Sequence, residues 1–422
     1  MHSVTNAIPT GTIASIPAKA HAHRALICAA LANSPSTILL SRTSKDIDAT
    51  MDSLRGLGAH VVYENKVVTV TPGPVPAKGN VVPHESGTTL RLLLPVAASI
   101  CNDVDVDAKG RLPDRPLEPM LGEMKAHGVT FSQDKPPFTM TGRIQGGQFN
   151  MVGDVSSQFF SGLLLAAPQI GLSTITATTP LQSSDYVTLT TETMRDFGVE
   201  VEHTLPDTNI SEAFTVPFGA SFIGRDNYQI EGDWSNAAIW MVAAGMTGKP
   251  ITITGMNKNS VQADRRIMQV MIDAGCDVVW DGMNITVTGR ASKPIHADLE
   301  QMPDMLPVMA ALACSISGES SFIKGARLRL KESDRLIAVA NLVRDLGGTV
   351  REEGDDLYII GSGILKGGHG DCVNDHRLVM AGTLMALISE NPVTLKDSEA
   401  ITKSYPDFFE DWNLLGGNAQ PV

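Results

Sequence analysis

The chain has 422 residues, of which 43% are hydrophobic and 19% are charged, and it carries a formal net charge of −13. This length is too great for one hydrophobic core, so two or three domains of an ordinary globular protein are expected. The negative charge argues against nucleic acid as a partner, because a phosphate backbone requires a basic surface. It does not exclude small anionic substrates, since a few Lys and Arg side chains in a cleft create a positive local field.

The five cysteines are scattered along the chain and form no CxxC pair. This usage favours reduced thiols over a disulfide framework or a zinc site, and we predict no bound metal. The sequence contains no run of 18 apolar residues, and its first residues lack the basic and apolar regions of a signal peptide. We therefore expect a cytoplasmic protein with no membrane partner.

A glycine signal recurs at intervals of about seventy residues, which indicates internal repetition. A helical pattern precedes each of the first five glycines, and alternating strand residues follow it. Glycine commonly ends a helix in the left-handed conformation, and a period of two is typical of a half-buried strand. Each glycine is thus predicted to end an amphipathic helix that leads into strands. The six positions are Gly58, Gly128, Gly198, Gly275, Gly347 and Gly416.

A second series of helices runs in phase with the first, and its members are apolar on nearly every side. A helix of this kind belongs in a core. Each repeat is therefore predicted to read strand, buried helix, strand, amphipathic helix and paired strands, or βαβαββ, in an α/β fold. In chain order the buried helices follow Lys19, Gly87, Ser157, Ser235, Pro303 and Asp375.

The sixth repeat stops at GGNAQPV, before its closing strands. The N-terminal stretch TGTIASI could supply one of those strands, which would place both chain ends in one domain. We infer two domains of three repeats each. One comprises residues 1–17 and 232–422, the other residues 18–231, and the chain passes between them near Ala18 and Gly232.

Polar residues cluster at the N-terminal ends of the buried helices, where free N–H groups and the helix dipole favour anions. If these ends face one interdomain cleft, they suit a substrate that carries phosphate and carboxylate groups. Candidates in the first half are Lys19, Arg24, Gly87, Thr88, Arg91, Arg115, Ser156, Ser157, Gln158, Ser183 and Tyr186. Candidates in the second half are Asp304, Lys331, Glu332, Arg335, His376, Arg377 and Lys403.

Taken singly, each candidate also has a plainer interpretation. An Arg at a helix start is usually a solvated cap, and serines such as Ser156 and Ser157 are more often N-caps than phosphate ligands. His21 and His23 lack a metal-ligand pattern, so packing or capping is the better interpretation. Asp46 and Asp233 fit either a cap or a site. The acids interpreted as caps of amphipathic helices are Asp185, Asp264, Asp334 and Asp407.

The order of several short strings resembles the 5-enolpyruvylshikimate-3-phosphate synthase family over essentially the whole chain. These strings are VSSQF at Val155–Phe159, KESDR at Lys331–Arg335, NDHR at Asn374–Arg377 and KSYPDF at Lys403–Phe408, with SGTTLR and DRP in the first half. The resemblance implies a two-domain inverse α/β prism of six βαβαββ repeats. It also implies transfer of the enolpyruvyl group of phosphoenolpyruvate to the 5-hydroxyl of shikimate 3-phosphate, without a metal or an organic cofactor, by a monomer.

Residue roles follow from the resemblance, position by position. Catalysis is assigned to Asp304, Glu332 and Lys19, with Glu332 transferring the proton at the methylene carbon. The residues implied for phosphoenolpyruvate are Lys19, Gly87, Arg115, Gln158, Arg335, Arg377 and Lys403. Those implied for shikimate 3-phosphate are Lys19, Arg24, Ser156, Ser157, Ser183, Tyr186, Asp304, Arg327 and Lys331, with Arg24 at the carboxylate.

The sequence departs from the family pattern at two positions. Ala20 follows the first lysine where the family usually has Ser, which removes one hydrogen bond to substrate, worth about 1 kcal/mol. Glu85 stands where the family often has Asn, and a carboxylate beside an anion is unfavourable unless it is turned away, protonated or paired. Substrate affinity is the property that these departures affect.

Two alternatives remain open at this point. The sister transferase that acts on UDP-N-acetylglucosamine usually presents a reactive cysteine in a Gly/Pro-rich loop, and the corresponding stretch GRLPDRPLEP has none. The second alternative is a non-catalytic relative that binds small phosphates, which only Ala20 and Glu85 favour. A phosphate-release assay with both acceptors distinguishes the three.

Overall fold

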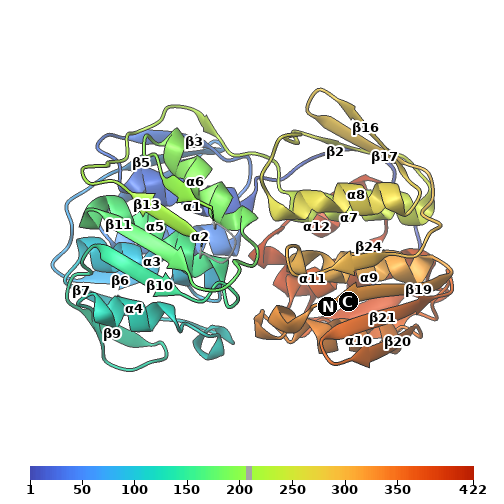
Figure 1. Cartoon of the computed structure of the whole chain (residues 1–422). Helices are drawn as coiled ribbons and strands as arrows, with labels where there is room; N and C mark the ends of the chain where they lie inside the picture. Colours follow the sequence, from blue (N-terminus) through green and yellow to red (C-terminus); the bar gives the residue numbers. More distant parts are fainter. Residues whose placement is uncertain (206–211) are drawn as a thin grey trace. The chain divides into compact units, whose positions relative to one another are not determined.

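The computed structural model describes residues 1–205 and 212–422 (Figure 1). The chain divides into two compact units, each with its own hydrophobic core. Unit 1 consists of Met1–Ile16 and Glu231–Val422, and unit 2 consists of Pro17–Ile230. Both contain buried helices, amphipathic helices and four-stranded sheets.

The apolar helices predicted from the sequence are confirmed, and they form the centre of each core. Nearly every residue of these helices is buried, because no side of them is polar. Within each unit they pack against one another. Unit 2 contains α1 (Lys19–Ala30), α3 (Gly87–Ile100) and α5 (Ser157–Ile170). Unit 1 contains α7 (Trp234–Thr247), α9 (Leu306–Ser315) and α11 (His376–Met385).

The amphipathic helices are confirmed as well, and each is followed by its predicted glycine. All six glycines have positive φ, between 86° and 104°, a region that costs residues with a Cβ free energy. The helices in unit 2 are α2 (Lys45–Gly56), α4 (Met120–Ala126) and α6 (Asp185–Asp196). Those in unit 1 are α8 (Ile267–Asp273), α10 (Arg335–Asp345) and α12 (Phe408–Leu414).

Within the described residues the strands form six four-stranded sheets of one pattern: the first two strands are parallel and the other pairs are antiparallel. In unit 2 the sheets are β14-β3-β5-β4, β6-β7-β9-β8 and β10-β11-β13-β12. Their strands are β3 (Ser36–Leu39), β4 (His60–Glu64), β5 (Val67–Thr71), β6 (Gly79–Val81), β7 (Asp103–Val106), β8 (Thr130–Phe131), β9 (Phe138–Thr141), β10 (Gly147–Met151), β11 (Ser173–Ala177), β12 (Glu202–Thr204), β13 (Ala213–Val216) and β14 (Tyr228–Gln229).

The sheets of unit 1 are β2-β15-β17-β16, β18-β19-β21-β20 and β22-β23-β1-β24. Figure 1 shows β19, β20 and β21 beside α9 and α10, which they cover. The strands in the sheets of unit 1 are β1 (His2–Val4), β2 (Gly11–Ala14), β15 (Ile251–Thr254), β16 (Asp277–Asp281), β17 (Asn284–Thr288), β18 (His296–Asp298), β19 (Gly318–Ile323), β20 (Thr349–Glu353), β21 (Asp356–Gly361), β22 (Gly368–Asp371), β23 (Val393–Lys396) and β24 (Ala419–Pro421).

The prediction that TGTIASI completes the sixth repeat is wrong. Its strand, β2, pairs in parallel with β15 of the fourth repeat, with Ile13 opposite Ile253. The sixth sheet is completed by β1, which lies between β23 and β24. The short strand β1 has no alternation long enough to be recognised, and β24 shows that the last repeat does have a closing strand. Figure 1 accordingly shows the two chain ends next to each other in unit 1.

The chain passes between the units directly after β2 and again directly after β14. In either case the strand stays in the sheet of the unit that the chain is leaving, because β2 pairs with β15 and β14 pairs with β3. Within unit 1 the two passages are joined by a hydrogen bond of 2.9 Å from Asp233 N–H to the carbonyl of Ile16. Glu231 is held there by hydrogen bonds from Asn257, Ser260 and Gln262.

Candidate active site

Arg335 is the centre of the charged cluster in unit 1. It is the first residue of α10, and only 1% of its surface is exposed. Its guanidinium donates to Asp304 Oδ1 at 2.6 Å, to Glu332 Oε2 at 2.6 Å and to Asp375 Oδ2 at 2.8 Å. Burial acts to lower the pKa of Arg335, but these carboxylates outweigh it and raise the pKa above its ordinary value. One cation therefore fixes the positions of both predicted catalytic carboxyls.

Asp304 lies in the short helix η3 (Pro303–Met305) and contacts three cations. Besides Arg335, its carboxylate pairs with Lys331 Nζ at 3.1 Å and with Arg377 Nη2 at 3.3 Å. Burial would raise the pKa of Asp304, but the charges of Lys331, Arg377 and Arg335 hold it well below its usual range. Asp304 is consequently ionised at neutral pH and can accept hydrogen bonds from hydroxyl groups.

Lys331 differs from its neighbours because its charge is easily lost. Burial lowers its pKa to about 8, although Asp304 raises it, and the positive charges of Arg335 and Arg327 lower it further. Arg327 belongs to η4 (Ala326–Leu330), the segment that leads into Lys331. A lysine in this state responds strongly to an incoming phosphate, which favours the charged form.

Two further predicted cations of unit 1, Arg377 and Lys403, lie at or beside the start of α11. Asp375 is its N-cap, and the Oδ1 atom accepts a hydrogen bond of 3.0 Å from the Arg377 backbone N–H. Lys403, the last residue of η6 (Ser398–Lys403), donates to the carbonyl of Asn374 at 2.8 Å. The strings KESDR, NDHR and KSYPDF are thus brought to one region of unit 1 by α10, α11 and η6.

In unit 2 several predicted residues lie at the starts of α1, α3 and α5, and others lie in or beside α1, η1 (Leu112–Asp114) and α6. Lys19, the first residue of α1, pairs with Asp46 Oδ2 at 2.7 Å. Asp46 lies in the first turn of α2, whose N-cap is Ser44. Of the two interpretations left open for Asp46, the structure therefore supports an ion pair with a site residue rather than a cap.

Arg24 is a buried cation whose hydrogen-bond acceptors within residues 1–205 and 212–422 are neutral groups. Its guanidinium donates to Thr190 Oγ1 at 2.7 Å, to Ser161 Oγ at 3.2 Å and to the carbonyls of Ala20 and Tyr186 at 2.7 and 3.0 Å. Burial is the largest influence on its pKa, which falls to about 10 although Tyr186 and Cys28 raise it. A buried positive charge without a carboxylate partner favours the approach of an anion.

The start of α3 brings Gly87 against Arg115. A Cβ atom at Gly87 would lie 2.5 Å from Arg115 Nη1, so only glycine leaves room for this guanidinium. Gln158 of α5 is oriented by two contacts, because its Oε1 accepts from Arg91 at 3.1 Å and its Nε2 donates to Thr88 at 2.9 Å. These contacts fix which end of the Gln158 amide can act as a donor.

The predicted phosphate ligands of unit 2 are buried near the starts of α5 and α6. Ser156 is the N-cap of α5, where its hydroxyl accepts from the Gln158 N–H at 3.3 Å, and Ser157 follows it. Ser183 is buried and has a φ of 55°, a conformation that residues other than glycine rarely adopt. Tyr186 lies in α6, and its carbonyl accepts hydrogen bonds from Arg24 and Thr190.

The interpretation of four acids as caps is correct for one of them. Asp334 caps α10 and accepts from the Ile337 N–H at 3.3 Å. Asp185 lies inside α6, and Asp407 is at the N-cap position of α12 without a side-chain cap bond. Asp264 lies inside a short helix and accepts a hydrogen bond from the Ser235 hydroxyl instead. Asp233, which was left open, caps α7 through the Asn236 N–H at 2.9 Å.

Sequence reasoning missed Asp375 as part of the charged cluster. The residue is fully buried, and Ser333 and Arg335 both donate to its carboxylate. Asp375 is part of the string NDHR, but its position directly before a buried helix also fits a simple cap. The acceptors of Arg24, namely Thr190 and Ser161, were missed as well, because nothing local marks two hydroxyl groups far along the chain.

The two departures from the family pattern have definite places in unit 2. The Glu85 side chain packs against Gly110, since a Cβ atom at Gly110 would lie 2.9 Å from the Glu85 Oε2 atom. The Gly110 φ of 59° and its lack of a side chain make room for that carboxylate. The Ala20 carbonyl accepts from Arg24, so the backbone at this position still helps to orient the guanidinium.

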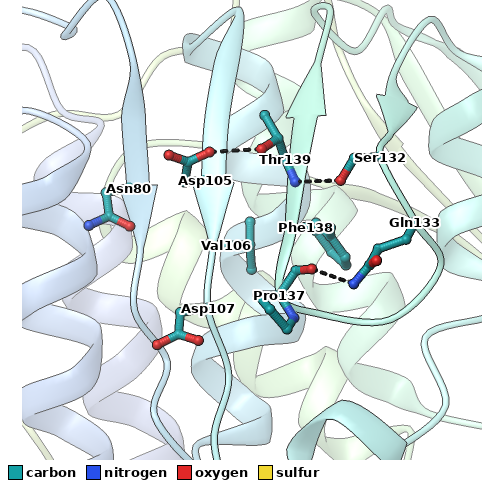
Figure 2. A pocket seen from close by; sticks show the side chains of 9 residues that line it. All are labelled: Asn80, Asp105, Val106, Asp107, Ser132, Gln133, Pro137, Phe138 and Thr139. Atoms are coloured by element: carbon teal, nitrogen blue, oxygen red, sulfur yellow. Dashed lines mark hydrogen bonds between the residues drawn. The ribbon is translucent and has the colours of Figure 1, made fainter.

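A cavity of about 340 Å³ opens elsewhere in unit 2, across β6, β7 and β9 (Figure 2). No predicted site residue lines it, and its acids, Asp105 and Asp107, would repel an anionic substrate. Asp105 is occupied by hydrogen bonds from Thr139 and Lys78. The lining residues are Asn80, Asp105, Val106, Asp107, Ser132, Gln133, Pro137, Phe138 and Thr139.

All five cysteines lie in the described part of the chain, where they are buried free thiols. Across residues 1–205 and 212–422, no group of three or more His, Cys, Asp or Glu side chains is placed to hold a metal ion. None of the helices in these same residues is long and apolar enough to cross a membrane.

Comparison with known proteins gives consistent results over the full chain. The family model for EPSP synthase (3-phosphoshikimate 1-carboxyvinyltransferase) matches residues 7–412. A 3-phosphoshikimate 1-carboxyvinyltransferase from Clostridium kluyveri is 36% identical over 96% of this chain and 95% of its own length. One from Methanocorpusculum labreanum is 34% identical over 97% of each chain. A solved EPSP synthase from Acinetobacter baumannii is similar in fold, with a TM-score of 0.80 at 23% identity over 100% of this chain and 99% of that one.

The six four-stranded sheets around buried helices form an inverse α/β fold. The family match over residues 7–412 makes the class of the protein an enolpyruvyl transferase. The chain belongs to the EPSP synthase family. Its activity is that of a 3-phosphoshikimate 1-carboxyvinyltransferase, which transfers the enolpyruvyl group from phosphoenolpyruvate to shikimate 3-phosphate in the shikimate pathway of aromatic amino acid biosynthesis.

Proposed function

We propose that the residues assigned above carry this reaction, and that the substrates engage residues of both units. The observation that carries the proposal is the cluster in which one buried guanidinium, that of Arg335, holds Asp304 and Glu332. Two carboxyls held in fixed positions but in different environments suit a reaction in which one proton is added and another is removed.

Glu332 is the proposed acid at the methylene carbon of phosphoenolpyruvate. Protonation of that carbon makes carbon 2 electrophilic, so that the 5-hydroxyl of shikimate 3-phosphate can attack it. Ionised Asp304 is proposed to hold the ring hydroxyls and accept the proton of the attacking group, with Lys19 assisting. The tetrahedral adduct then expels phosphate, which takes the hydroxyl proton back from Asp304, while Glu332 takes a proton back from the methyl group. Both acid and base roles are thereby reversed.

The shikimate 3-phosphate carboxylate is proposed to bind Arg24. Support comes from the burial of this cation among neutral acceptors, which a carboxylate would complement through a charge-assisted pair. The phosphate is proposed to bind Ser156, Ser157 and Ser183, with Tyr186 nearby. Lys331 and Arg327 are proposed to bind the same phosphate through their positive charges. The negative charge of the phosphate would raise the pKa of Lys331, which burial lowers, and so favour its charged form.

Phosphoenolpyruvate is proposed to bind cations and donors from both units. These are Lys19, Gly87, Arg115, Gln158, Arg335, Arg377 and Lys403. Support comes from their positions at or beside the N-terminal ends of buried helices, where backbone N–H groups favour anions. The proposed partners are these two small anions alone, acted on by a cytoplasmic monomer, and the net charge of −13 supports the exclusion of nucleic acid.

Arg377→Met and Lys19→Met test the use of both units. Each variant is expected to raise the KM for phosphoenolpyruvate at least tenfold, because a charge-assisted hydrogen bond contributes about 1.5–3 kcal/mol. The measurement is phosphate release at saturating shikimate 3-phosphate. Arg344→Met, which removes an exposed Arg of the same unit as Arg377, serves as the control. Unaltered saturation in either site variant would contradict the placement of that residue.

Gly87→Ala tests the fit between Gly87 and Arg115. The added methyl group would meet the guanidinium at 2.5 Å, so Arg115 must move away from its place at the start of α3. We expect the KM for phosphoenolpyruvate to rise severalfold while the KM for shikimate 3-phosphate stays within about twofold, because Arg115 is assigned only to the first substrate. Equal changes in both constants would show a general distortion instead. Gly122→Ala in α4, where the added Cβ would approach only the end of the Glu118 side chain, at 3.1 Å, is the control.

A further inference from the structure

Three helices of unit 2 are joined by a buried row of hydrogen bonds that the proposed reaction does not use. Nδ1 of His23, in α1, lies 2.6 Å from Thr50 Oγ1, in α2. Thr50 Oγ1 in turn lies 2.7 Å from the hydroxyl of Thr89, in α3, and Thr89 donates to Ser86 Oγ at 2.8 Å. No more than 1% of any of these four residues is exposed, so little water competes for the bonds of the row.

The direction of these bonds follows from the number of hydrogens available, because each hydroxyl carries one. Thr89 directs its hydrogen to Ser86, with the Asp46 carbonyl at 3.3 Å. It must therefore accept from Thr50. Thr50 has then used its own hydrogen and must accept from His23, which makes Nδ1 the protonated nitrogen of the ring. Across residues 1–205 and 212–422, the His23 Nε2 atom has no hydrogen-bond partner, which agrees with a nitrogen that has no hydrogen to donate.

His23 supplies the first bond of the row without adding a positive charge. Burial is the largest influence on its pKa, and the positive charges of Lys19 and Arg24 act in the same direction, so the pKa lies well below its ordinary value. The ring is therefore neutral at neutral pH. A neutral donor suits this position, because two cations assigned to the substrates already lie on α1.

The row runs beside an ion pair that joins two of the same helices. Lys19 and His23 are four residues apart in α1. Their partners in α2, Asp46 and Thr50, are four residues apart as well. Residues with this spacing lie one above the other on a helix face, so α1 is joined to α2 at two successive turns. Thr89 contacts both Thr50 and the Asp46 carbonyl, and the first turn of α3 is thus fixed relative to Lys19.

We propose that His23 is a positioning residue for phosphoenolpyruvate, which acts by holding the first turn of α3 at a fixed place relative to Lys19. The inference rests on the roles proposed above for Lys19 and Gly87. Gly87 directly follows Ser86, the N-cap that receives the last bond of the row and also accepts from the Thr89 N–H at 3.2 Å. Without the row, the backbone of this turn would no longer be held in one place for the anion.

Thr50→Val tests the proposal because it removes the hydroxyl at the middle of the row and nearly keeps the shape of the side chain. We expect the KM for phosphoenolpyruvate to rise about three- to tenfold, the range that one neutral hydrogen bond corresponds to. We expect kcat and the KM for shikimate 3-phosphate to stay within about twofold, because the row positions one substrate only. The measurement is steady-state phosphate release with each substrate varied in turn.

Two further variants separate the hydrogen bond from packing. Thr50→Ser keeps the hydroxyl and loses a methyl group, so its KM for phosphoenolpyruvate is expected to stay within about twofold of the wild-type value. Thr193→Val is the matched control, because this buried threonine of α6 donates to the carbonyl of Leu189 in its own helix. Its KM values should not change. Equal KM values in Thr50→Val and Thr50→Ser, or equal increases for both substrates, would overturn the proposal and leave a merely structural role.

His23→Leu and His23→Asn provide a second pair should Thr50→Val fold poorly. An amide N–H of Asn can replace the Nδ1 hydrogen, so the Asn variant is expected to keep a KM that the Leu variant raises. NMR of wild-type protein with ¹⁵N-labelled histidine, in which the signals of His23 are those lost in His23→Asn, should show Nδ1 protonated and Nε2 bare from about pH 6 to pH 8. A hydrogen on Nε2, or a Leu variant with normal KM, would also overturn the proposal.

Lys19→Met separates a failure of this inference from a failure of the proposed function. If Lys19→Met binds phosphoenolpyruvate normally, the proposed function itself fails. If Lys19→Met is impaired while Thr50→Val and Thr50→Ser behave alike, only the present inference fails.

Discussion

Glu332→Gln is expected to lower kcat by about 10²–10⁴-fold while the KM of each substrate changes by less than about threefold. The amide cannot donate a proton to the methylene carbon, so the loss appears in the transition state. Its oxygen can still accept the hydrogen bond that Glu332 receives from Arg335, so the cluster keeps its geometry. The measurement is steady-state phosphate release with each substrate varied in turn.

Deuterium incorporation makes this test specific to proton transfer. In heavy water the wild-type enzyme is expected to place deuterium in the methylene group of the product, and Glu332→Gln is expected to lose this incorporation together with turnover. Glu352→Gln, in which the acid pairs with Arg344 at the surface, is the control and should behave as the wild type. Near-normal turnover in Glu332→Gln would remove Glu332 from the mechanism.

Arg335→Met is expected to lower the free energy of unfolding by about 3–5 kcal/mol and to abolish measurable turnover. The reason is that Asp375, Asp304 and Glu332 would all lose the cation that they share, and Asp375 is fully buried. A buried carboxylate left without its partner costs more than the pair contributed. Equilibrium unfolding in urea, followed by circular dichroism, measures the change. Arg344→Met, at an exposed pair, should change stability by less than about 1 kcal/mol.

The loss of unfolding free energy in Arg335→Met is expected to depend on pH in one direction. The pKa of Asp304 in the folded protein is held well below its ordinary value, so its contribution is present above about pH 4 and is lost as the pH falls through the lower folded value. Removal of Arg335 removes one of the positive charges that lower the pKa of Asp304. The stability difference between wild type and Arg335→Met should therefore be greatest above about pH 4 and should narrow on acidification. A difference that is independent of pH would show that lost packing, not lost charge, is the cause.

The repeat architecture could be predicted because its signals are local. Glycines such as Gly58 and Gly347 end amphipathic helices with positive φ, and an apolar helix such as α7 can only be buried. The partners of short strands could not be predicted in this way. The strand β14 has two residues and β1 has three, too few to show a period of two, and only the pairing of distant segments defines their sheets.

The same distinction applies to the candidate site: proximity within one motif could be predicted from the sequence, and contacts between separate repeats could not. Lys331, Glu332 and Arg335 share one motif, so their proximity follows from the sequence. The contacts that determine their chemistry join separate repeats, as when Arg335 reaches Asp304 and Asp375. The row of hydrogen bonds that joins α1, α2 and α3 also spans separate elements, and nothing local marks its hydroxyl groups.

The position of β1 determines when the protein can finish folding during its synthesis. The strands described in unit 2 have all been made once residue 230 has been added, so this unit can form while the ribosome is still translating the rest. The strand β1, which precedes every strand of unit 2 in the chain, has to wait for β23 and β24, which follow all of them. Unit 1 therefore remains incomplete until β24 (Ala419–Pro421) has been made, so the last sheet of the enzyme forms only after unit 2 has had time to fold.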